Sequence, residues 1–393
     1  MNILHVVPTF YPATYWGGPI FSLHALCNAL AARPGFELKV VTTDAAGPRL
    51  AERLNVAEFP VRYAAGYEVY FSRRRWGREI SLGLLGQLWA MIRWADVVHL
   101  TGTYSFPVIP ALLLCRVFGR PVVWSPRGGL QRWAGSSRPW AKLLWERVCN
   151  ALLVKGRAVL HVTSEKEGKE SGLRIPRAEI ACVPNGVELP AMPANRRWKP
   201  EGRLRLLYMG RLDPKKGIEN LLKALVSLSD IDLQLMICGR GVEDYEEKLQ
   251  RLVAQLRLGG RVRFLGQVDG VNKAHVVFHS DLCVVPSFTE NFGMVVAEAL
   301  AHGVPVIASQ GTPWAGLVQR GCGMWVENSP QSLAGAIALM SQSNLELMGD
   351  RGRKWMERDF CWRTIAGRIS EVYVKLASDQ QAQLIDSRNR FQG

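Results

Sequence analysis

Residues 286–301 read PSFTENFGMVVAEALA, and this stretch decides the fold class of the chain. It follows an apolar run at residues 282–285 and then shows helical spacing, which predicts a strand, a short loop and a helix. Gly293, where the helix begins, lets a ligand approach the backbone closely. The free amide groups of the first helical turn can receive phosphate or sugar oxygens. We therefore expect a ligand-binding loop where this strand gives way to the helix.

Two carboxylates belong to the same stretch. Glu290 precedes the helix, and Glu298 lies about one and a half turns inside it. Placed in this way, they can accept hydrogen bonds from two different polyols, a sugar near the loop and a ribose deeper in. The alternative is that Glu290 caps the helix and Glu298 is an ordinary solvated residue.

Short apolar and β-branched runs alternate with helical patterns along the whole chain. Helices are predicted, for example, at residues 21–33, 218–228 and 244–256. Strands are predicted at residues 3–7, 38–42, 97–100, 121–125, 158–162, 180–183, 204–209, 233–238, 262–265, 282–285 and 304–308. Consecutive apolar positions are typical of parallel strands that are covered on both faces. The pattern predicts an α/β protein with doubly wound sheets.

This alternation is interrupted at residues 190–200, PAMPANRRWKP, where three prolines predict an interdomain linker. We expect one domain over residues 1–190 and a second over residues 200–361, which agrees with the ~100–200 residues of a usual domain. A helix is predicted at residues 362–377. The polar residues 380–393 are expected to be frayed.

Composition excludes several classes of protein. Hydrophobic residues make up 48% and charged residues 21% of the 393, which excludes disordered and fibrous proteins. No apolar run reaches the ~20 residues of a membrane-spanning helix. The first residues, MNILH, lack a basic region and a cleavage site, so we expect no signal peptide and a cytoplasmic protein. None of the eight cysteines lies within three residues of another, which predicts buried free thiols in a reducing compartment.

The charge is unusual. The chain carries a net charge of +15, and residues 1–190 hold 23 basic and 13 acidic residues. The excess in the first half indicates an anionic partner, which can be a membrane surface, a phosphorylated substrate or nucleic acid.

Two glycine-containing loops also follow predicted strands. Residues 210–218, GRLDPKKGI, place Arg211 at the carboxyl end of a strand, where open α/β sheets bind ligands. Arg211 and Lys216 can pair with a diphosphate, although a solvated basic turn is the alternative. Gly17 and Gly18 follow the first strand, and their backbone can approach an anion or simply form a turn.

Together these motifs resemble a known family. The Glu290-x7-Glu298 pattern, the loop at residues 210–217, the sequence VPNGV at residues 183–187 and the Gly17-Gly18 pair are similar to the retaining GT-B glycosyltransferases of family 4 (glycosyl transferases group 1), of the polysaccharide and O-antigen assembly type. The resemblance covers nearly the whole chain and is strongest over residues 204–308.

The resemblance implies a GT-B fold, in which two Rossmann-like domains face each other across a cleft. The C-terminal domain would bind a nucleotide-sugar and the N-terminal domain the acceptor. The helix at residues 362–377 would pack back on the N-terminal domain. The implied activity is glycosyl transfer (EC 2.4) with retention of configuration.

The resemblance also implies roles for single residues. Arg211 and Lys216 would stabilise the donor diphosphate, Glu290 would contact the donor sugar, and Glu298 would hold the ribose. Further donor-binding residues would be Gly17, Gly18, Phe292, Gly293, Met294, Gly239 and Arg240. The base would be recognised by backbone groups around Arg240 and residues 264–268.

No metal or other cofactor is expected, because the cationic side chains and helix N-termini can stabilise the leaving diphosphate. Residues 230–232, DID, look like the DxD metal motif of another glycosyltransferase fold. They precede a strand, whereas that motif follows one, so we interpret them as a surface turn.

One residue departs from the family pattern. Many relatives carry a histidine just after the strand at residues 121–125, where this chain has Arg127. An arginine cannot act as a neutral base, so Arg127 is predicted to bind an acceptor phosphate or the donor. His99 and His161 end apolar strands, and both polar and purely structural roles stay open for them.

Two stretches combine basic and aromatic residues. One is residues 73–78, RRRWGR, followed by the apolar residues 80–94, and the other runs from Arg132 and Trp133 to Arg147. They suit an anionic lipid surface, or else their tryptophans belong to the core of the domain. The first interpretation predicts peripheral binding at the inner face of the plasma membrane and a lipid-linked saccharide acceptor. Alternatives are a soluble small-molecule acceptor, or a non-catalytic protein that binds lipid or nucleic acid, although no nucleic-acid-binding signature is present.

Overall fold

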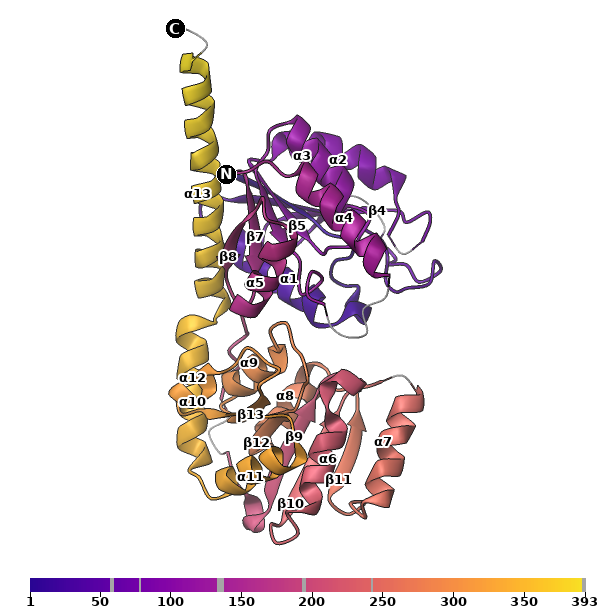
Figure 1. Ribbon diagram of the computed structural model, residues 1–393, viewed down its shortest axis with the longest axis vertical. Helices are drawn as coiled ribbons and strands as arrows, with labels where there is room; N and C mark the ends of the chain where they lie inside the picture. Colours follow the sequence, from indigo (N-terminus) through magenta and orange to yellow (C-terminus); the bar gives the residue numbers. More distant parts are fainter. Residues whose placement is uncertain (57–59, 78, 133–137, 193–195, 242, 391–393) are drawn as a thin grey trace. The chain divides into compact units, whose positions relative to one another are not determined.

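The computed structural model describes residues 1–393 except 57–59, 78, 133–137, 193–195, 242 and 391–393 (Figure 1). The chain forms two compact units. Unit 1 comprises Met1–Gly186 and Trp362–Gly393, and unit 2 comprises Val187–Cys361. The first boundary therefore lies a few residues before the predicted end of the first domain at residue 190.

Unit 1 is built on an eight-stranded sheet in the order β3-β4-β2-β1-β5-β6-β7-β8. Only the β3–β4 pair is antiparallel. The strands are β1 (Asn2–Val6), β2 (Glu37–Thr43), β3 (Val61–Arg62), β4 (Glu68–Ser72), β5 (Val97–Thr101), β6 (Val122–Ser125), β7 (Ala158–Val162) and β8 (Glu179–Cys182).

Helices cover both faces of this sheet because side chains alternate between the two faces of a strand. Leu4 and Val6 of β1 pack with helices α2, α3 and α4. Ile3 and Val7 pack instead with α1 and α13, on the opposite face. The helices of unit 1 are α1 (Gly18–Ala31), α2 (Leu82–Trp94), α3 (Val108–Val117), α4 (Pro139–Leu152), α5 (Glu165–Arg174) and α13 (Trp362–Arg390), with a 3-10 turn η1 (Thr14–Trp16).

Unit 2 contains a six-stranded parallel sheet in the order β11-β10-β9-β12-β13-β14. Its strands are β9 (Leu204–Met209), β10 (Leu233–Cys238), β11 (Val262–Gly266), β12 (Leu282–Val285), β13 (Val306–Ser309) and β14 (Gly323–Val326). Its α-helices are α6 (Ile218–Val226), α7 (Glu243–Gln255), α8 (Gly270–Phe278), α9 (Met294–Ala301), α10 (Gly316–Gln319), α11 (Pro330–Ser341) and α12 (Leu345–Asp359). Two 3-10 turns are η2 (Pro200–Gly202) and η3 (Pro214–Lys216).

Helices α6, α7 and α11 cover one face of the second sheet, and α9, α10 and α12 cover the other. The doubly wound α/β prediction is confirmed in both units. In each sheet the strand order reverses next to the first strand, between β1 and β5 and between β9 and β12. Such switch points open a crevice at the carboxyl ends of the strands, where ligands bind in this class of sheet.

Some elements differ from the prediction. Strands β3, β4 and β14 were not predicted, and all three lie at or next to a sheet edge. The prediction of a frayed segment after residue 380 is wrong up to Arg390, because α13 continues to that residue. Gln, Ala, Leu and Arg are good helix formers, which explains how this polar stretch extends the helix.

Residues 190–200, predicted as a linker, belong to unit 2. Arg196 donates to the backbone oxygens of His302 (2.9 Å) and Gly303 (3.2 Å), and the backbone N–H of Lys199 donates to the Asp281 carboxylate at 3.0 Å. These bonds fix the described part of the segment on the amino-terminal side of the second sheet.

Asp281 is fully buried and holds this side of unit 2 together. Its carboxylate accepts from Nε and Nη2 of Arg205 at 3.0 and 2.7 Å, and from the Arg205 backbone N–H at 2.8 Å. The guanidinium of Arg205 is itself only 16% exposed.

We expect Asp281→Ala to lower the free energy of unfolding of unit 2 by about 3–5 kcal/mol, because it leaves the Arg205 charge buried without its partner. Urea unfolding measures this loss. Asp232→Ala is the matched control: Asp232 also pairs with an arginine, Arg203, but both side chains are more than half exposed. That change should cost at most about 1 kcal/mol. Equal losses in the two variants would contradict the role given to Asp281.

The chain passes between the units at residues 186–187 and 361–362. Within unit 1, Gly186 lies against the indole of Trp362, so that a Cβ atom at Gly186 would come within 2.4 Å of the ring. Within unit 2, the Val187 N–H donates to the Phe360 oxygen at 2.8 Å, and Val187 forms a parallel bridge with Cys361. Each unit therefore brings its own two crossing residues side by side.

Within the part of the chain that the structure describes, no helix has the length and apolar character needed to cross a bilayer. The same residues contain no group of three or more His, Cys, Asp or Glu side chains placed to hold a metal ion.

Candidate active site

Two loops meet at the β9–β12 switch point of unit 2. The Phe288 N–H donates to the Lys215 oxygen at 2.8 Å. Gly217 has a φ of 65°, and a Cβ atom there would lie 2.1 Å from the Pro286 oxygen. The loop after β9 and the loop after β12 are therefore in direct backbone contact, and only glycine fits at this point.

The contact brings Lys216 and Glu290 together. The Lys216 ammonium pairs with Oε1 of Glu290, and both side chains are 16% exposed. The Ser287 hydroxyl donates to the same oxygen at 2.8 Å. Glu290 is thus an oriented, partly buried carboxylate at the carboxyl edge of the sheet.

Positive charge gathers beside this pair. The side chain of Arg211 is exposed and makes no hydrogen bond or ion pair with any described residue. Burial lowers the pKa of Lys215, and the nearby charges of Arg211 and Lys216 add to this effect. The geometry leaves the Arg211 guanidinium open to an anionic ligand. Lys216 has three donors, so it can bind an anion while it keeps Glu290.

The start of α9 follows Glu290 directly. Gly293 has a φ of 79° and is the N-cap of the helix, and Met294 is its first residue. The indole N–H of Trp314 donates to the Phe292 oxygen at 2.5 Å, and the Glu290 N–H donates to the Gly311 oxygen at 3.0 Å. These bonds hold the loop so that the first-turn amides of α9 are fixed beside Lys216 and Glu290, where they can receive an anion.

Glu298 lies further along α9. Its Oε1 pairs with the Lys273 ammonium of α8 at 2.7 Å, and the two side chains are 23% and 31% exposed. Glu298 is therefore a partly buried carboxylate held by a lysine, and its predicted contact with a ribose stays a prediction. Lys273 was not found from the sequence, because no motif links it to a residue 25 positions away on another helix.

The ends of β9 and β10 approach each other closely at two glycines. Gly210 and Gly239 have φ values of 145° and 146°, and a Cβ atom at Gly239 would lie 1.8 Å from the Gly210 oxygen. The Arg240 oxygen accepts from the Leu212 N–H at 2.9 Å, while the Arg240 side chain is exposed. Only glycine fits at position 239, because the backbones at the ends of the two strands lie in direct contact.

The other predicted residues belong to unit 1. Gly17 has a φ of 71° and is the N-cap of α1, whose first residue is Gly18. Arg127 follows β6 with a φ of 52°, a conformation that is costly for a residue other than glycine. Its guanidinium donates to the Asn185 side chain, and its buried Nε has no hydrogen-bond partner among the described residues.

A buried carboxylate supports the Arg127 turn. Glu167 is fully buried, and it accepts from the N–H of Gly128 at 2.6 Å and from the N–H and hydroxyl of Thr163 at 2.7 and 2.9 Å. Its charge partly offsets the effect of burial, which lowers the pKa of Arg127. The loop that carries Arg127 is therefore held rigidly at the carboxyl edge of the first sheet.

His99 and His161 are structural. His161 Nε2 lies 2.9 Å from the Val183 oxygen, which only accepts, so Nε2 carries the proton and Nδ1 accepts from Ser125 at 2.7 Å. Ser125 in turn accepts from His99 Nε2 at 2.6 Å. The side chains of His99, Ser125 and His161, on β5, β6 and β7, therefore form one chain of hydrogen bonds in which each donates to the next acceptor.

The chain of hydrogen bonds continues to α13. His99 Nδ1 accepts from the Tyr373 hydroxyl at 2.5 Å, and Tyr373 accepts from His5 Nε2 at 3.3 Å. Burial, with the Arg127 charge nearby, lowers the pKa of His5 and of His161 to about 3 and holds the pKa of His99 well below its usual value. All three imidazoles are neutral at pH 7, and the chain ties α13 to the first sheet.

The DID sequence and the cysteines lie apart from the candidate site. Asp232 of the DID sequence is exposed and pairs with Arg203 at 2.9 Å, as expected for a surface turn. All eight cysteines are free thiols, and Cys182 is exposed while Cys361 is partly buried. The prediction of buried thiols is therefore wrong for Cys182.

The structure thus brings Arg211, Lys216, Glu290 and the start of α9 together at one edge of unit 2. Comparison with known proteins identifies the family of the chain. Residues 195–355 match the model of the family "Glycosyl transferases group 1", and residues 17–186 match that of the "Glycosyl transferase 4-like domain". The chain belongs to the group 1 (family 4) glycosyltransferases and has their GT-B fold of two Rossmann-like domains.

Curated relatives match part of their own length. The chain is 29% identical to the D-inositol 3-phosphate glycosyltransferase of Corynebacterium glutamicum over 58% of this chain and 59% of the relative. It is 32% identical to the phosphatidyl-myo-inositol mannosyltransferase of Mycobacterium leprae over 50% of this chain and 54% of the relative. The matched region therefore spans little more than half of these relatives.

A solved structure matches over nearly the whole chain. The Anabaena protein HepE is 18% identical, and the match covers 95% of this chain and 99% of HepE. The TM-score is 0.70 for the complex of HepE with UDP and 0.66 for its complex with UDP-glucose. At this identity the likeness concerns the fold.

Proposed function

We propose that the protein is a retaining glycosyltransferase that moves a sugar from a nucleotide-diphosphate sugar to a lipid-linked saccharide in the assembly of a cell-surface polysaccharide. The observation that carries the proposal is the cluster of Lys216, Glu290 and Ser287 beside the open Arg211 guanidinium. Family membership and the UDP-glucose complex of HepE support a nucleotide-sugar donor.

The charges suit the chemistry of the donor. When the bond between the anomeric carbon and the diphosphate oxygen breaks, negative charge grows on the diphosphate. We assign the stabilisation of that charge to Arg211, Lys216 and the first-turn amides of α9, which the Lys216–Glu290 pair and the Gly293 cap support. Glu290 accepts hydrogen bonds from the sugar, and Glu298, held by Lys273, accepts them from the ribose. In a retaining reaction on one face, the leaving phosphate takes the proton of the acceptor hydroxyl that attacks the anomeric carbon.

The acceptor side is assigned to unit 1. Arg127 has a strained backbone, a buried Nε that no described residue accepts from, and a rigid support from Glu167, which suits a residue that binds an acceptor phosphate. The name of the mycobacterial relative, a mannosyltransferase of a phosphatidylinositol, supports a lipid acceptor. A protein that uses such an acceptor works at the inner face of the plasma membrane, from the cytoplasm.

The first test is the thermal stability of the chain with UDP-, GDP-, ADP- and CMP-linked sugars, each with EDTA or with Mg²⁺. We expect one nucleotide class to raise the melting temperature equally in both conditions, because the diphosphate is bound by Arg211 and Lys216 without a metal. A ligand at ~100 times its dissociation constant adds about 2.7 kcal/mol to stability. Stabilisation that requires Mg²⁺ would contradict the metal-free site, and no stabilisation by any nucleotide would contradict the donor site itself.

Transfer to a lipid-linked saccharide and to its water-soluble headgroup analogue then identifies the acceptor class. We expect transfer to the lipid-linked form to be faster. Equal rates would favour a soluble small-molecule acceptor.

A further inference from the structure

The structure separates the two interpretations of the basic and aromatic stretches. Arg74 is fully buried and donates to the backbone oxygens of Gly47 and Glu52, so it belongs to the core. Trp145 is partly buried and donates to the Thr103 oxygen at 2.9 Å. By contrast Trp76, Trp89 and Trp140 are more than half exposed. Arg78 and Trp133 lie outside the described residues.

The exposed apolar residues form stripes on three neighbouring helices. Helix α3 packs against both α2 and α4, and all three cover the same face of the first sheet (Figure 1). Each presents large apolar side chains to solvent at helical spacing. These are Leu82 and Trp89 on α2, Leu113 and Val117 on α3, and Trp140, Leu143, Leu144 and Val148 on α4. We call the solvent-facing side of α2, α3 and α4 the apolar face.

The apolar face is unlike the other surface helices of the chain. Helix α2 has one charged residue among its 13, whereas α7, which is equally long, has six. Helix α3 likewise has one charged residue among its 10. A helix that covers a sheet normally turns a polar side to water. The low charge of α2 and α3 indicates that this side faces something other than water.

The charges that are present on this side are positive. Residues 101–157 contain nine Lys and Arg and a single acidic residue, Glu146. Glu146 is buried and pairs with Arg132 at 2.7 Å and with Arg174 at 3.5 Å, so it contributes no negative charge to the surface. Each of these helices carries an arginine: Arg93 and Arg116 lie in the last turns of α2 and α3, and Arg147 lies further from the end of α4.

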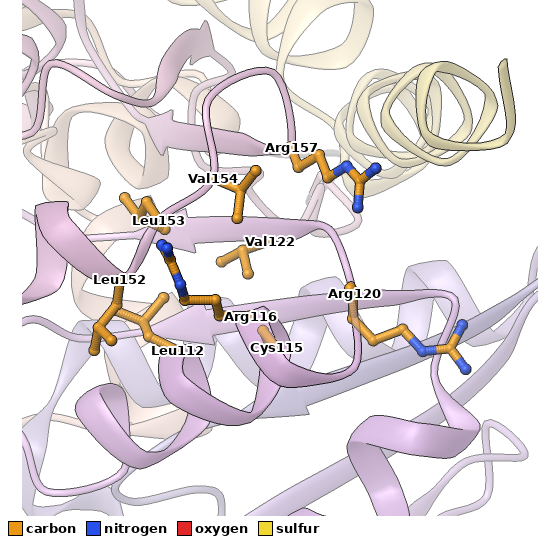
Figure 2. A pocket seen from close by; sticks show the side chains of 10 residues that line it. Leu112, Cys115, Arg116, Arg120, Val122, Leu152, Leu153, Val154 and Arg157 are labelled. Atoms are coloured by element: carbon orange, nitrogen blue, oxygen red, sulfur yellow. The ribbon is translucent and has the colours of Figure 1, made fainter. Parts of the chain in front are cut away.

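A pocket lies at the same end of the helices. Three arginines, Arg116, Arg120 and Arg157, line this pocket together with apolar residues such as Val122, at the start of β6; Figure 2 shows the Arg120 and Arg157 side chains extending outward from Val122. None of the ten described residues that line this pocket is acidic. The pocket is at the amino-terminal ends of β6 and β7, the edge opposite to the one that carries Arg127, so it is separate from the candidate active site.

The pocket arginines keep donors for a ligand. Arg116 donates to the Ala151 oxygen at 3.1 Å, and Arg120 donates to the Arg93 oxygen at 2.5 Å. These bonds cap the C-terminal ends of α4 and α2, and no carboxylate of a described residue pairs with either guanidinium. A guanidinium has five N–H donors and matches the geometry of phosphate oxygens.

We propose that the apolar face docks on an anionic bilayer and that the pocket of Arg116, Arg120 and Arg157 receives the phosphate of a lipid headgroup. Apolar stripes with Trp and Leu enter the boundary between headgroups and acyl chains, and the arginines contact the anionic headgroups. This inference deepens the proposed function, because it names the surface by which the protein reaches a lipid-linked acceptor.

The test is sedimentation of the full chain with vesicles of phosphatidylcholine alone or with added phosphatidylglycerol, at low and at high salt. We expect binding to the anionic vesicles, weakened by salt, and little binding to the neutral ones. The double variant Leu143→Ser/Leu144→Ser should bind at least tenfold more weakly, and Arg116→Gln/Arg120→Gln about 30-fold more weakly.

Matched controls come from unit 2. Val318→Ser/Leu339→Ser removes two apolar side chains that are about 60% exposed, and Arg251→Gln/Arg263→Gln removes two exposed charges. Both should bind vesicles like the unchanged chain. Since Arg116 and Arg120 also cap helices, Arg116→Lys/Arg120→Lys tests whether the charge itself matters, and it should retain most of the binding.

Three results would overturn the proposal. The first is no binding to anionic vesicles at low salt, and the second is that the variants of the apolar face and of the pocket bind like the unchanged chain. The third is that the control variants lose as much binding as those variants do. Inorganic phosphate and chloride are then compared at equal ionic strength. If phosphate displaces the chain from the vesicles and chloride does not, the pocket binds a free anion instead. No donor or acceptor is needed for these measurements. A chain that binds vesicles but transfers no sugar would support docking and refute the proposed function.

Discussion

Lys216→Met is expected to lower the rate of sugar transfer at least ~100-fold, because it removes a cation from the developing diphosphate charge. The pair with Glu290 is only 16% exposed, so the variant also leaves a partly buried carboxylate without its lysine. The loss should therefore affect transfer at saturating donor as well as donor affinity. Single-turnover transfer and donor titration measure the two effects separately.

Glu290→Gln tests the other partner. The amide keeps the size of the side chain and can still accept from the Ser287 hydroxyl, but it loses the charge that orients Lys216. We again expect a loss of about 100-fold or more in transfer. Lys223→Met and Glu247→Gln are matched controls on the exposed sides of α6 and α7 and should transfer normally. Normal transfer by Lys216→Met or Glu290→Gln, with the fold intact, would refute the assigned site.

Acidification from pH 7 to pH 5 is expected to destabilise unit 1 by about 6 kcal/mol. His5, His99 and His161 have lowered pKa values in the folded chain, about 3 for His5 and His161, whereas unfolded histidine has a pKa near 6.5. Below pH 6.5 the unfolded chain takes up protons that the folded chain does not, so stability is lost as the pH falls toward 3. Each histidine contributes about 2 kcal/mol of this loss by pH 5.

Urea unfolding of the full chain at pH 7, 6 and 5 measures the loss. His5→Gln keeps a donor for the Tyr373 hydroxyl and should reduce the pH dependence by about a third, whatever its effect on stability at pH 7. The exposed pair His275 and His279 provides the control, because His275→Gln/His279→Gln should leave the pH dependence unchanged. A pH dependence that is the same in all three chains would contradict the role of the buried histidines.

Central strands could be predicted from the sequence almost to the residue. The predicted strands at 158–162, 204–209, 233–238 and 282–285 have the bounds of β7, β9, β10 and β12. Covered on both faces, they are mostly apolar runs with few polar residues, which is a strong signal. Strands β3 and β14 escaped because an edge strand is short and half exposed, so its sequence resembles a loop.

Some features of the candidate site could likewise be predicted from the sequence, and others could not. Arg211, Lys216 and Glu290 could be predicted because each belongs to a local motif at the end of a strand. The bond from Trp314 that holds the Phe292 oxygen, and the pair between Lys273 and Glu298, depend on how distant segments pack. Local spacing contains no information about such contacts, and so the sequence predicts the residues at the strand ends but not the contacts that hold them in place.

For the two basic and aromatic stretches, the sequence could not show which residues are exposed. Arg74 and Trp145 had the same composition signal as Trp76 and Trp140, yet Arg74 is buried, Trp145 is partly buried against the core, and the last two face solvent. Composition alone does not separate these cases, because a buried arginine can be satisfied by backbone oxygens alone as well as by water. Leu113 and Val117 of α3, which complete the apolar face, gave no basic or aromatic signal at all.

Because unit 1 is discontinuous, the two units complete their cores in a particular order during synthesis on the ribosome. Its sheet is complete by residue 186, but the core on one face also needs Ile365, Ile369 and Tyr373 of α13. At about 5–20 residues per second, the ribosome takes roughly 10–35 seconds to translate unit 2 before α13 emerges. During that time His99 lacks the hydrogen bond from the Tyr373 hydroxyl, because α13 has not yet been made. Unit 2, whose chain is continuous, can complete its own core first, although it is second in the sequence.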